Sequence, residues 1–424
     1  MFHTDEAAAL LDRRTRDGLV VPDYEGYCVA NVPGTAADAL GVDIGRSLPS
    51  DALDSVESGA SHVVVVLLDG LGWHRFHRDG EDHRLLARLA DRGTVTPLTA
   101  VTPSSTASAI TTMHTAAVPA EHGVFGWDVR LPDHETVVEA FPHEIRSAGD
   151  ETDDPAPPVS SDEVVCADPV YPALEAAGVD TAVVQSADTL GTAYADATFE
   201  GATQVPVDDV VHGATALRER LESVDGPSYT YCYVSDLDSA SHDYGTDSGA
   251  YHDALATATR ALSRALYDDL DPATADETLL VVTADHGFVD FEPGPEGCLD
   301  VFSIDAVTES LARTSSGDPV RPWGDYRFLH LAVRDGAVDR ARRALEAHGV
   351  TVLTREGVRD RGCFGPEAGP VFDRRCGDLV CAHPDLKLVY PSAESIVPKT
   401  GMHGGPTPRE MLVPFAATRL SNLQ

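Results

Sequence analysis

The chain has 424 residues, of which 42% are hydrophobic, so it can bury a sizeable core and wholesale disorder is excluded. Asp and Glu number 69 against 31 Lys and Arg, which gives a formal net charge of −38. Because this charge repels nucleic-acid phosphates and anionic membranes, neither is expected as the main partner.

The basic residues are almost all arginines. Only two of the 31 are lysines, Lys387 and Lys399. An acid excess with few lysines is typical of proteins that work in concentrated salt, where at about 1 M the Debye length is about 3 Å and exposed carboxylates barely repel one another. We therefore predict a halophilic protein; an ordinary acidic cytosolic protein is the alternative.

The sequence does not predict a membrane protein. The longest plain apolar run, residues 63–68, has six residues, whereas a spanning helix needs about 20. The first residues include acids and lack an apolar core, so we expect no signal peptide. The seven cysteines are odd in number and form no Cys-x-x-Cys pair, which predicts free thiols and a cytoplasmic location.

Segments with the pattern of buried strands alternate along the chain with segments of helical period. The strand candidates are 62–70, 180–186, 230–238 and 278–287. Residues 249–270 place apolar side chains on one face at helical spacing and predict an amphipathic helix. This alternation predicts an α/β fold built on a mostly parallel sheet with helices on both faces.

The composition changes twice along the chain. Residues 146–164 are acidic and rich in proline, which predicts an exposed loop or linker without a catalytic role. From 300 to 395 the pattern changes to short strands and helices of a small α/β unit. We therefore expect a core of residues 1–299 and 396–424 and an inserted cap or lid of residues 300–395.

Carboxylates directly follow three of the predicted strands. Asp69 ends the first, Asp236 and Asp238 end the third, and Asp285 with His286 ends the fourth. In an open parallel sheet, ligands bind outside the carboxyl ends of the strands. A single aspartate there is usually a cap or turn residue. Several acids crowded at one edge are costly unless a cation lies among them, so the three ends together predict a metal site.

Histidines extend this predicted metal site. His242 lies four residues after Asp238, and His403 lies in the glycine-rich segment 401–405, whose backbone can turn freely. Mixed carboxylate and imidazole ligands suit zinc best, with manganese or iron less favoured. Most of the other histidines among the 17 are expected on the surface or in packing, and His122 is expected to be structural.

The segment 100–123 offers a nucleophile. Pro103 holds the chain extended, and the hydroxyl residues after it lead into a stretch of helical period. A threonine at this junction lies where free N–H groups and the helix dipole bind an anion, and a metal can activate it for attack on phosphorus. The alternative is that Ser104, Ser105 or Thr106 only caps the helix.

Together these motifs resemble those of the alkaline phosphatase superfamily, and its type I phosphodiesterase/nucleotide pyrophosphatase family is the most similar branch. The matching blocks occur in the family's order and frame most of the chain: Asp69-Gly70, Pro103-Ser-Ser-Thr106, Pro119-Ala-Glu-His122-Gly123, Asp238 with His242, Asp285-His286-Gly287, and His403-Gly404.

The resemblance implies an alkaline-phosphatase-like fold and a hydrolase of phosphate diesters or pyrophosphates that acts on a small molecule through a phosphothreonine intermediate. It implies two divalent metals, for which we favour zinc over manganese. Thr106 is the implied nucleophile. The implied ligands of one metal are Asp69, Thr106, Asp285 and His286, and those of the other are Asp238, His242 and His403. A phosphomonoesterase of the same superfamily and a metal-bound module without turnover are the alternatives.

The chain departs from the family at two places. Relatives of the nucleotide pyrophosphatase type carry an asparagine, which steadies a phosphoryl oxygen, where this chain has Trp127. Their Phe-Pro-Asn after the nucleophile is Ala107-Ser108-Ala109 here. The sequence therefore does not support a nucleobase pocket. It also lacks the Cys/Ser-x-Pro-x-Arg segment of the sulfatase branch.

Overall fold

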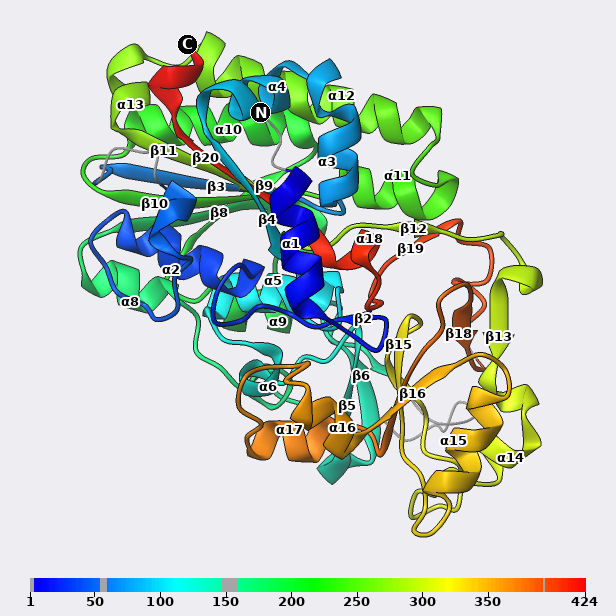
Figure 1. The fold of residues 1–424 in the computed structure, drawn as a ribbon. Coiled ribbons are helices and arrows are strands. Elements are labelled where there is room, and N and C mark those ends of the chain that lie inside the picture. The colour runs from blue at the N-terminus through cyan, green and yellow to red at the C-terminus, as the bar shows by residue number, and fades with distance from the viewer. Residues whose placement is uncertain (1–3, 54–58, 147–158, 392) are drawn as a thin grey trace.

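The computed structural model describes residues 4–53, 59–146, 159–391 and 393–424. Its largest unit is a seven-stranded sheet, here called the first sheet (Figure 1). Strand β20 runs antiparallel to both of its neighbours, and the other strands run in one direction. The strand order is β4 (Thr94–Thr99), β20 (Leu412–Arg419), β11 (Thr278–Thr283), β3 (His62–Leu68), β10 (Ser228–Val234), β8 (Asp180–Ser186) and β9 (Thr203–Val207).

Helices cover both faces of the first sheet (Figure 1). On one face lie α3 (Trp73–Asp79), α4 (Arg84–Arg92), α10 (Val210–Ser223), α12 (Gly249–Ser263) and α13 (Pro272–Glu277). On the other lie α2 (Val32–Asp38), α5 (Thr106–Thr115), α8 (Tyr171–Ala176) and α9 (Ala193–Thr198). Because β3 and β11 lie between the two layers, every side chain in them is buried, which explains their uninterrupted apolar runs. The predicted α/β fold with a mostly parallel sheet is confirmed.

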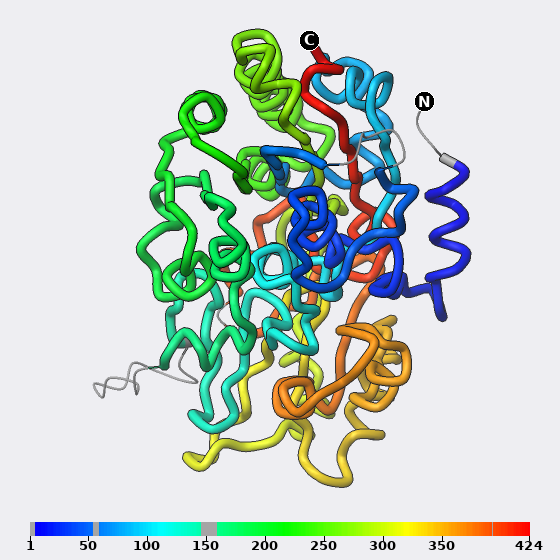
Figure 2. Tube along the Cα trace, turned by 90° about the vertical axis from the view of Figure 1, so that its left-hand side faces the viewer, coloured from blue at the N-terminus to red at the C-terminus, as the bar shows by residue number. Residues whose placement is uncertain are grey.

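A second seven-stranded sheet lies at the other end of the molecule, and both views agree on this placement (Figures 1 and 2). All of its pairings are antiparallel. The strand order is β16 (Thr351–Thr354), β17 (Leu379–Ala382), β15 (Phe328–Leu331), β14 (Trp323–Asp325), β5 (Asp128–Leu131), β6 (Thr136–Glu139) and β7 (Ile145–Arg146). Its helices include α14 (Asp305–Thr308), α15 (Val338–Glu346), α16 (Arg355–Asp360) and α17 (Pro370–Arg375).

The second sheet draws on both sides of the boundary expected at residue 300. Strands between 323 and 382 come from the segment expected to form a cap, and the strands of 128–146 come from the expected core. The two groups meet where Gly324 of β14 pairs with Asp128 of β5. The division into a core and a 300–395 cap remains a prediction, and the sheet that carries this cap also includes β5 to β7.

Several predicted elements end earlier than their sequence patterns. Strands β3 and β11 stop short of Asp69 and Asp285, and β10 stops at Val234 because α11 (Asp236–Tyr244) begins there. The predicted helix over 249–270 is α12, followed by one π turn over 264–268. Asp69 and Asp285 therefore lie in turns just beyond their strands, and Asp238 lies in the first turn of α11.

Two further expectations concern the remaining segments. Within the predicted loop 146–164, residues 147–158 lie outside the described residues, and the last four residues form α7 (Ser161–Val164). Each helix in the described ranges is too short or too polar to cross a bilayer.

Candidate active site

The carboxyl ends of three adjacent strands, β11, β3 and β10, form one edge of the first sheet. Asp69 lies directly after β3, Asp285 lies just beyond β11, and Asp238 lies in the first turn of α11. His403 reaches the same edge because β12 (Val289–Asp290) pairs with β19 (Gly401–Met402). The structure thus gathers at this edge side chains that are far apart in the sequence.

The first cluster consists of Asp69, Asp285 and His286. One ligand atom of each lies within 4.8 Å of the others. Nε2 of His286 is 3.3 Å from Oδ1 of Asp69 and 3.2 Å from Oδ2 of Asp285. Oγ1 of Thr106 is 3.0 Å from the same nitrogen. The threonine hydroxyl therefore lies against the first cluster, as the resemblance implied.

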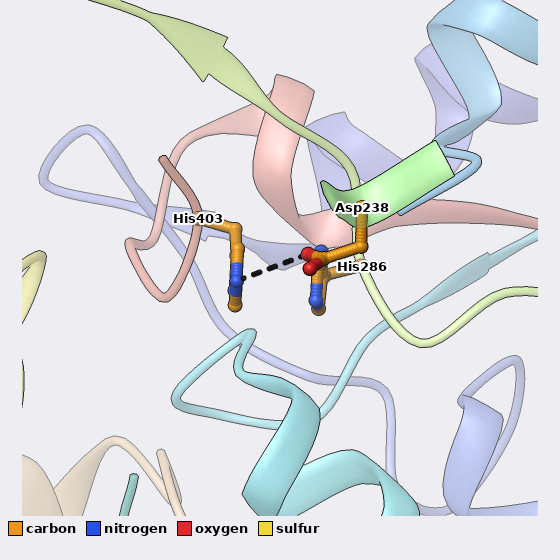
Figure 3. A group of neighbouring side chains, drawn as sticks. All are labelled: Asp238, His286 and His403. Atoms are coloured by element: carbon orange, nitrogen blue, oxygen red, sulfur yellow. Dashed lines mark ion pairs between the residues drawn. The ribbon is translucent and has the colours of Figure 1, made fainter. Parts of the chain in front are cut away.

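The second cluster consists of Asp238, His242 and His403. Oδ1 of Asp238 is 3.4 Å from Nε2 of His242 and 3.5 Å from Nε2 of His403, and the two Nε2 atoms are 3.2 Å apart. Figure 3 shows Asp238 and His403 converging with His286, and these three also form a group within 4.8 Å. The rings of His286 and His403 stack at 3.6 Å with an interplanar angle of 6°, so the two clusters adjoin.

Backbone carbonyls set the orientation of the second-cluster imidazoles. Nδ1 of His242 donates to the carbonyl of Gly401 at 2.8 Å, and Nδ1 of His403 donates to the carbonyl of Ser104 at 3.1 Å. Because a carbonyl only accepts, each Nδ1 carries the proton and each Nε2 presents a lone pair. Two lone pairs that face each other at 3.2 Å repel unless a cation lies between them or beside them.

The carboxylates of both clusters point to the same conclusion. Within the described part of the chain, three of their buried oxygens lack a hydrogen-bond partner: Oδ1 of Asp69, Oδ1 of Asp238 and Oδ2 of Asp285. Buried polar atoms are almost always paired, so one orphaned oxygen on each predicted acidic ligand is the arrangement expected around cations. These residues fit divalent metals with mixed oxygen and nitrogen ligation.

Burial shifts the charge states of both clusters toward neutrality. It raises the pKa of Asp285 to about 6. It also raises the pKa of Asp69, and the negative charges of Asp285 and Asp238 raise that pKa further. Burial also lowers the pKa of His286 to about 4, and it lowers the pKa of His403, with His286 and His242 adding to the effect. Burial thus disfavours both anionic carboxylates and cationic imidazoles. A bound metal cation suits this site, since it stabilises carboxylates as anions and imidazoles in the neutral form.

Thr106 is the first residue of α5, and the residue at the N-cap position is Ser105. The side chain of Ser105 makes no capping hydrogen bond, and Ser104 instead donates to the carbonyl of Gly405 at 2.7 Å. None of the three hydroxyls thus caps α5. The Thr106 hydroxyl faces His286 at the positive end of the helix dipole, where it can attack an anionic substrate.

A family model for type I phosphodiesterase / nucleotide pyrophosphatase matches residues 63–406. The chain belongs to this family. The predicted resemblance to this family is confirmed, and the protein is a phosphoric ester hydrolase. No curated protein sequence matches the chain.

Solved structures share the fold of this family member. Murine ectonucleotide pyrophosphatase/phosphodiesterase 5 is similar with a TM-score of 0.63 and 16% identity, covering 84% of this chain and 88% of that chain. An inactive form of the same murine protein in complex with AMP gives a TM-score of 0.62 and 15% identity, covering 84% and 88%. Phosphonoacetate hydrolase from Sinorhizobium meliloti, in complex with phosphonoacetate, gives 0.55 and 20%, covering 84% and 89%.

Two residues noted in the comparison with the family, His122 of a motif block and Trp127 at a departure from the family, lie outside the clusters. His122 is fully buried, with Nε2 3.0 Å from Oγ1 of Thr112 and Nδ1 accepting from the amide of Val124, so it is structural in this family member, as expected. Trp127, where relatives have asparagine, donates its indole N–H to Glu139 at 3.0 Å.

The sequence did not identify three residues that support the clusters. The hydroxyl of Tyr233, in β10, donates to Oδ2 of Asp69. Glu410 and Arg327 form a fully buried ion pair beside the segment that carries His403. A tyrosine next to the end of a central strand is a weak signal for the first contact, and no local pattern marks the ion pair.

Proposed function

We propose that this protein hydrolyses a phosphate diester or a pyrophosphate through a phosphothreonine at Thr106, assisted by two divalent metals. Asp69, Asp285, His286 and Thr106 would hold one ion, and Asp238, His242 and His403 would hold the other. The observation that carries the proposal is the set of three orphaned buried carboxylate oxygens in the two clusters, with the Thr106 hydroxyl against His286 of the first cluster. When bound, the two ions would lower the pKa of the hydroxyl and stabilise the charge of the leaving oxygen.

The reaction balances with the residues at hand and water. The Thr106 oxygen forms a bond to phosphorus, the bond from phosphorus to the leaving alcohol or phosphate breaks, and the hydroxyl proton passes through solvent to the leaving oxygen. Water then attacks the phosphothreonine, which returns the threonine hydroxyl and releases a phosphate monoester. The α5 N-terminus would orient the phosphoryl oxygens during both displacements.

Charge favours a diester over a monoester. In the described part of the chain, no arginine or lysine forms an ion pair with either cluster, so three carboxylates face two divalent ions. The net charge of that set is about +1, which complements the single negative charge of a diester. A monoesterase would need a further cation for its doubly charged phosphate. Trp127 stands where relatives have an asparagine, so this chain has no side-chain amide there to contact a nucleotide. We therefore propose no nucleotide preference.

A substrate panel tests this proposal. We expect hydrolysis of bis-p-nitrophenyl phosphate to exceed that of p-nitrophenyl phosphate with Zn²⁺ or Mn²⁺ supplied. Mass spectrometry of protein quenched in acid during turnover should find phosphate on the peptide that contains Thr106. Faster turnover of the monoester would favour the phosphomonoesterase, and bound metal without turnover of any ester would favour a non-catalytic module.

The same assays, run at salt concentrations from 0.1 M to about 3 M, test the halophilic character expected from the charge of −38. We propose on composition alone that the protein works in salt-rich cytoplasm. Rising activity and thermal stability with salt would support this, and loss of both above 1 M would contradict it.

A further inference from the structure

Glu410 is a fully buried carboxylate in α18 (Pro408–Met411) that no motif of the site includes. Its side chain accepts from Nε of Arg327 at 3.0 Å, from the amide of Gly405 at 2.9 Å and from Oγ1 of Thr407 at 2.6 Å. Its own carbonyl accepts from the amide of Gly287 at 2.9 Å. One residue therefore bonds to the backbone of two separate segments.

Both segments carry a cluster histidine. Gly287 directly follows His286, and Gly405 lies two residues after His403. These are the two histidines whose rings stack where the clusters adjoin. The space around Glu410 is closed on the Gly405 side, because a Cβ at Gly405 would meet a Glu410 carboxylate oxygen at 2.6 Å. Glu410 thus fixes the two histidine segments against each other.

Arg327 supplies the opposite charge from the second sheet. It lies between β14 and β15, it is fully buried, and its guanidinium lies 4.6 Å over the ring of Phe291. It also donates to the carbonyls of His383 and Leu386. A charge buried this deeply is stable only when paired, so Arg327 and Glu410 must be retained or replaced together.

We propose that the Arg327–Glu410 pair is a positioning device, which sets the separation of His286 and His403 and so makes metal binding at the first sheet depend on the second sheet. The inference rests on the proposed role of the two clusters as metal sites. Neither residue touches a reacting atom. The pair acts through the backbone of Gly287 and Gly405.

The test is a metal titration of Glu410→Gln, with Zn²⁺ affinity measured by competition with a chelating dye. The amide keeps the shape and an acceptor for Gly405 but removes the charge that holds Arg327. We expect Zn²⁺ to bind about 10–100-fold more weakly, as for other residues that orient metal ligands. Added Zn²⁺ should restore turnover, which it would not do for a protein that is merely misfolded.

Two further variants isolate the effect. The double variant Arg327→Met with Glu410→Gln leaves no unpaired charge, so it should fold even if the single variant does not, and its Zn²⁺ affinity should still fall. Asp378→Asn breaks the pair with Arg355, the first residue of α16 beside the second sheet, and within the described residues neither partner belongs to either cluster. This control should bind Zn²⁺ as the wild type does.

Wild-type Zn²⁺ affinity in both Glu410 variants would overturn the inference, as would a loss of turnover that added Zn²⁺ does not restore. The affinity readout is separate from the proposed function. A wild type that binds two metals without hydrolysing any ester would refute the function and leave the positioning result to stand or fall on affinity. A wild type that binds no metal would overturn both.

Discussion

The two seven-stranded sheets contribute to the site in different ways. The first sheet supplies reactive groups, because Asp69, Asp238 and Asp285 follow three of its adjacent strands. The second sheet supplies no residue to either cluster among the residues that the structure describes, yet Arg327 reaches the segment next to His403 through Glu410. The contrast teaches that ligands and the contacts that hold them can come from separate sheets, and that only the ligands leave a motif.

The largest effect is expected when the first sheet's site loses the Thr106 hydroxyl, the proposed nucleophile. Thr106→Ala should lower turnover by about 10⁴-fold or more, since the nucleophile is lost, while both clusters keep their carboxylates and imidazoles and still bind metal. Steady-state rates and metal analysis of the same sample check this. Thr106→Ser, which keeps a hydroxyl, is the control, and normal hydrolysis by the alanine variant would refute the nucleophile.

A smaller effect should separate ligands from other acids at the same edge. Asp238→Asn should weaken metal binding and lower turnover by about 10²–10³-fold, because an amide replaces a charged ligand. The control is Asp236→Asn, two residues earlier on α11 and outside both clusters. Equal losses in the two variants, measured by metal titration and diester hydrolysis, would contradict the assignment.

A still smaller effect should come from support within the first sheet. Tyr233→Phe removes the hydroxyl that donates to Asp69, so we expect metal affinity to fall by about 10-fold with little change in fold. Tyr231→Phe is the matched control in β10, because the Tyr231 hydroxyl is buried and has no hydrogen-bond partner within the described part of the chain. The dye-competition assay should distinguish the two, and similar affinities would argue against support by Tyr233.

The smallest expected effect is the change in Tm caused by Asp285→Asn, whose sign depends on whether metal is bound. Burial raises the pKa of Asp285 from 3.8 to about 6, so in metal-free protein the folded state holds this proton longer than the unfolded state and loses stability as pH rises through about 6. Without metal, Asp285→Asn should therefore raise Tm by a few degrees at pH 8 and by about half as much at pH 5, which lies between the two pKa values.

With metal, the same variant should melt below the wild type at pH 8, because a ligand is missing. Melting curves with EDTA and with Zn²⁺ at the two pH values give the four numbers needed. If the variant destabilises the metal-free protein at pH 8, the negative charge of Asp285 does not destabilise the metal-free fold.

Much of the first sheet could be predicted because its evidence is local. Strands β3 and β11 have seven and six residues, all of them buried, and an acid follows each strand within two residues. The apolar run thus predicts the strand, and the acid after it predicts the ligand. The strand over 230–238 was predicted too long, since Asp236 already belongs to α11. Continuous apolar character marks a buried strand well and marks its end poorly.

The second sheet and the supporting contacts could not be predicted in the same way. Arg327 and Glu410 are 83 residues apart, and nothing near either residue indicates the other. The pairing of β5 with β14 likewise joins Asp128 to Gly324, and the sequence pattern of neither segment predicts this pairing. Such contacts are consequences of the assembled fold.

The position of β20 has a consequence for how the protein is made. This strand is the last of the first sheet in chain order, yet it lies between β4 and β11. A nascent chain on the ribosome therefore leaves the edge strand β4 unpaired with the rest of the sheet until residues 412–419 have been translated. His403 and Glu410 are translated only shortly before β20. A metal ion that binds earlier during synthesis would therefore meet an incomplete set of ligands.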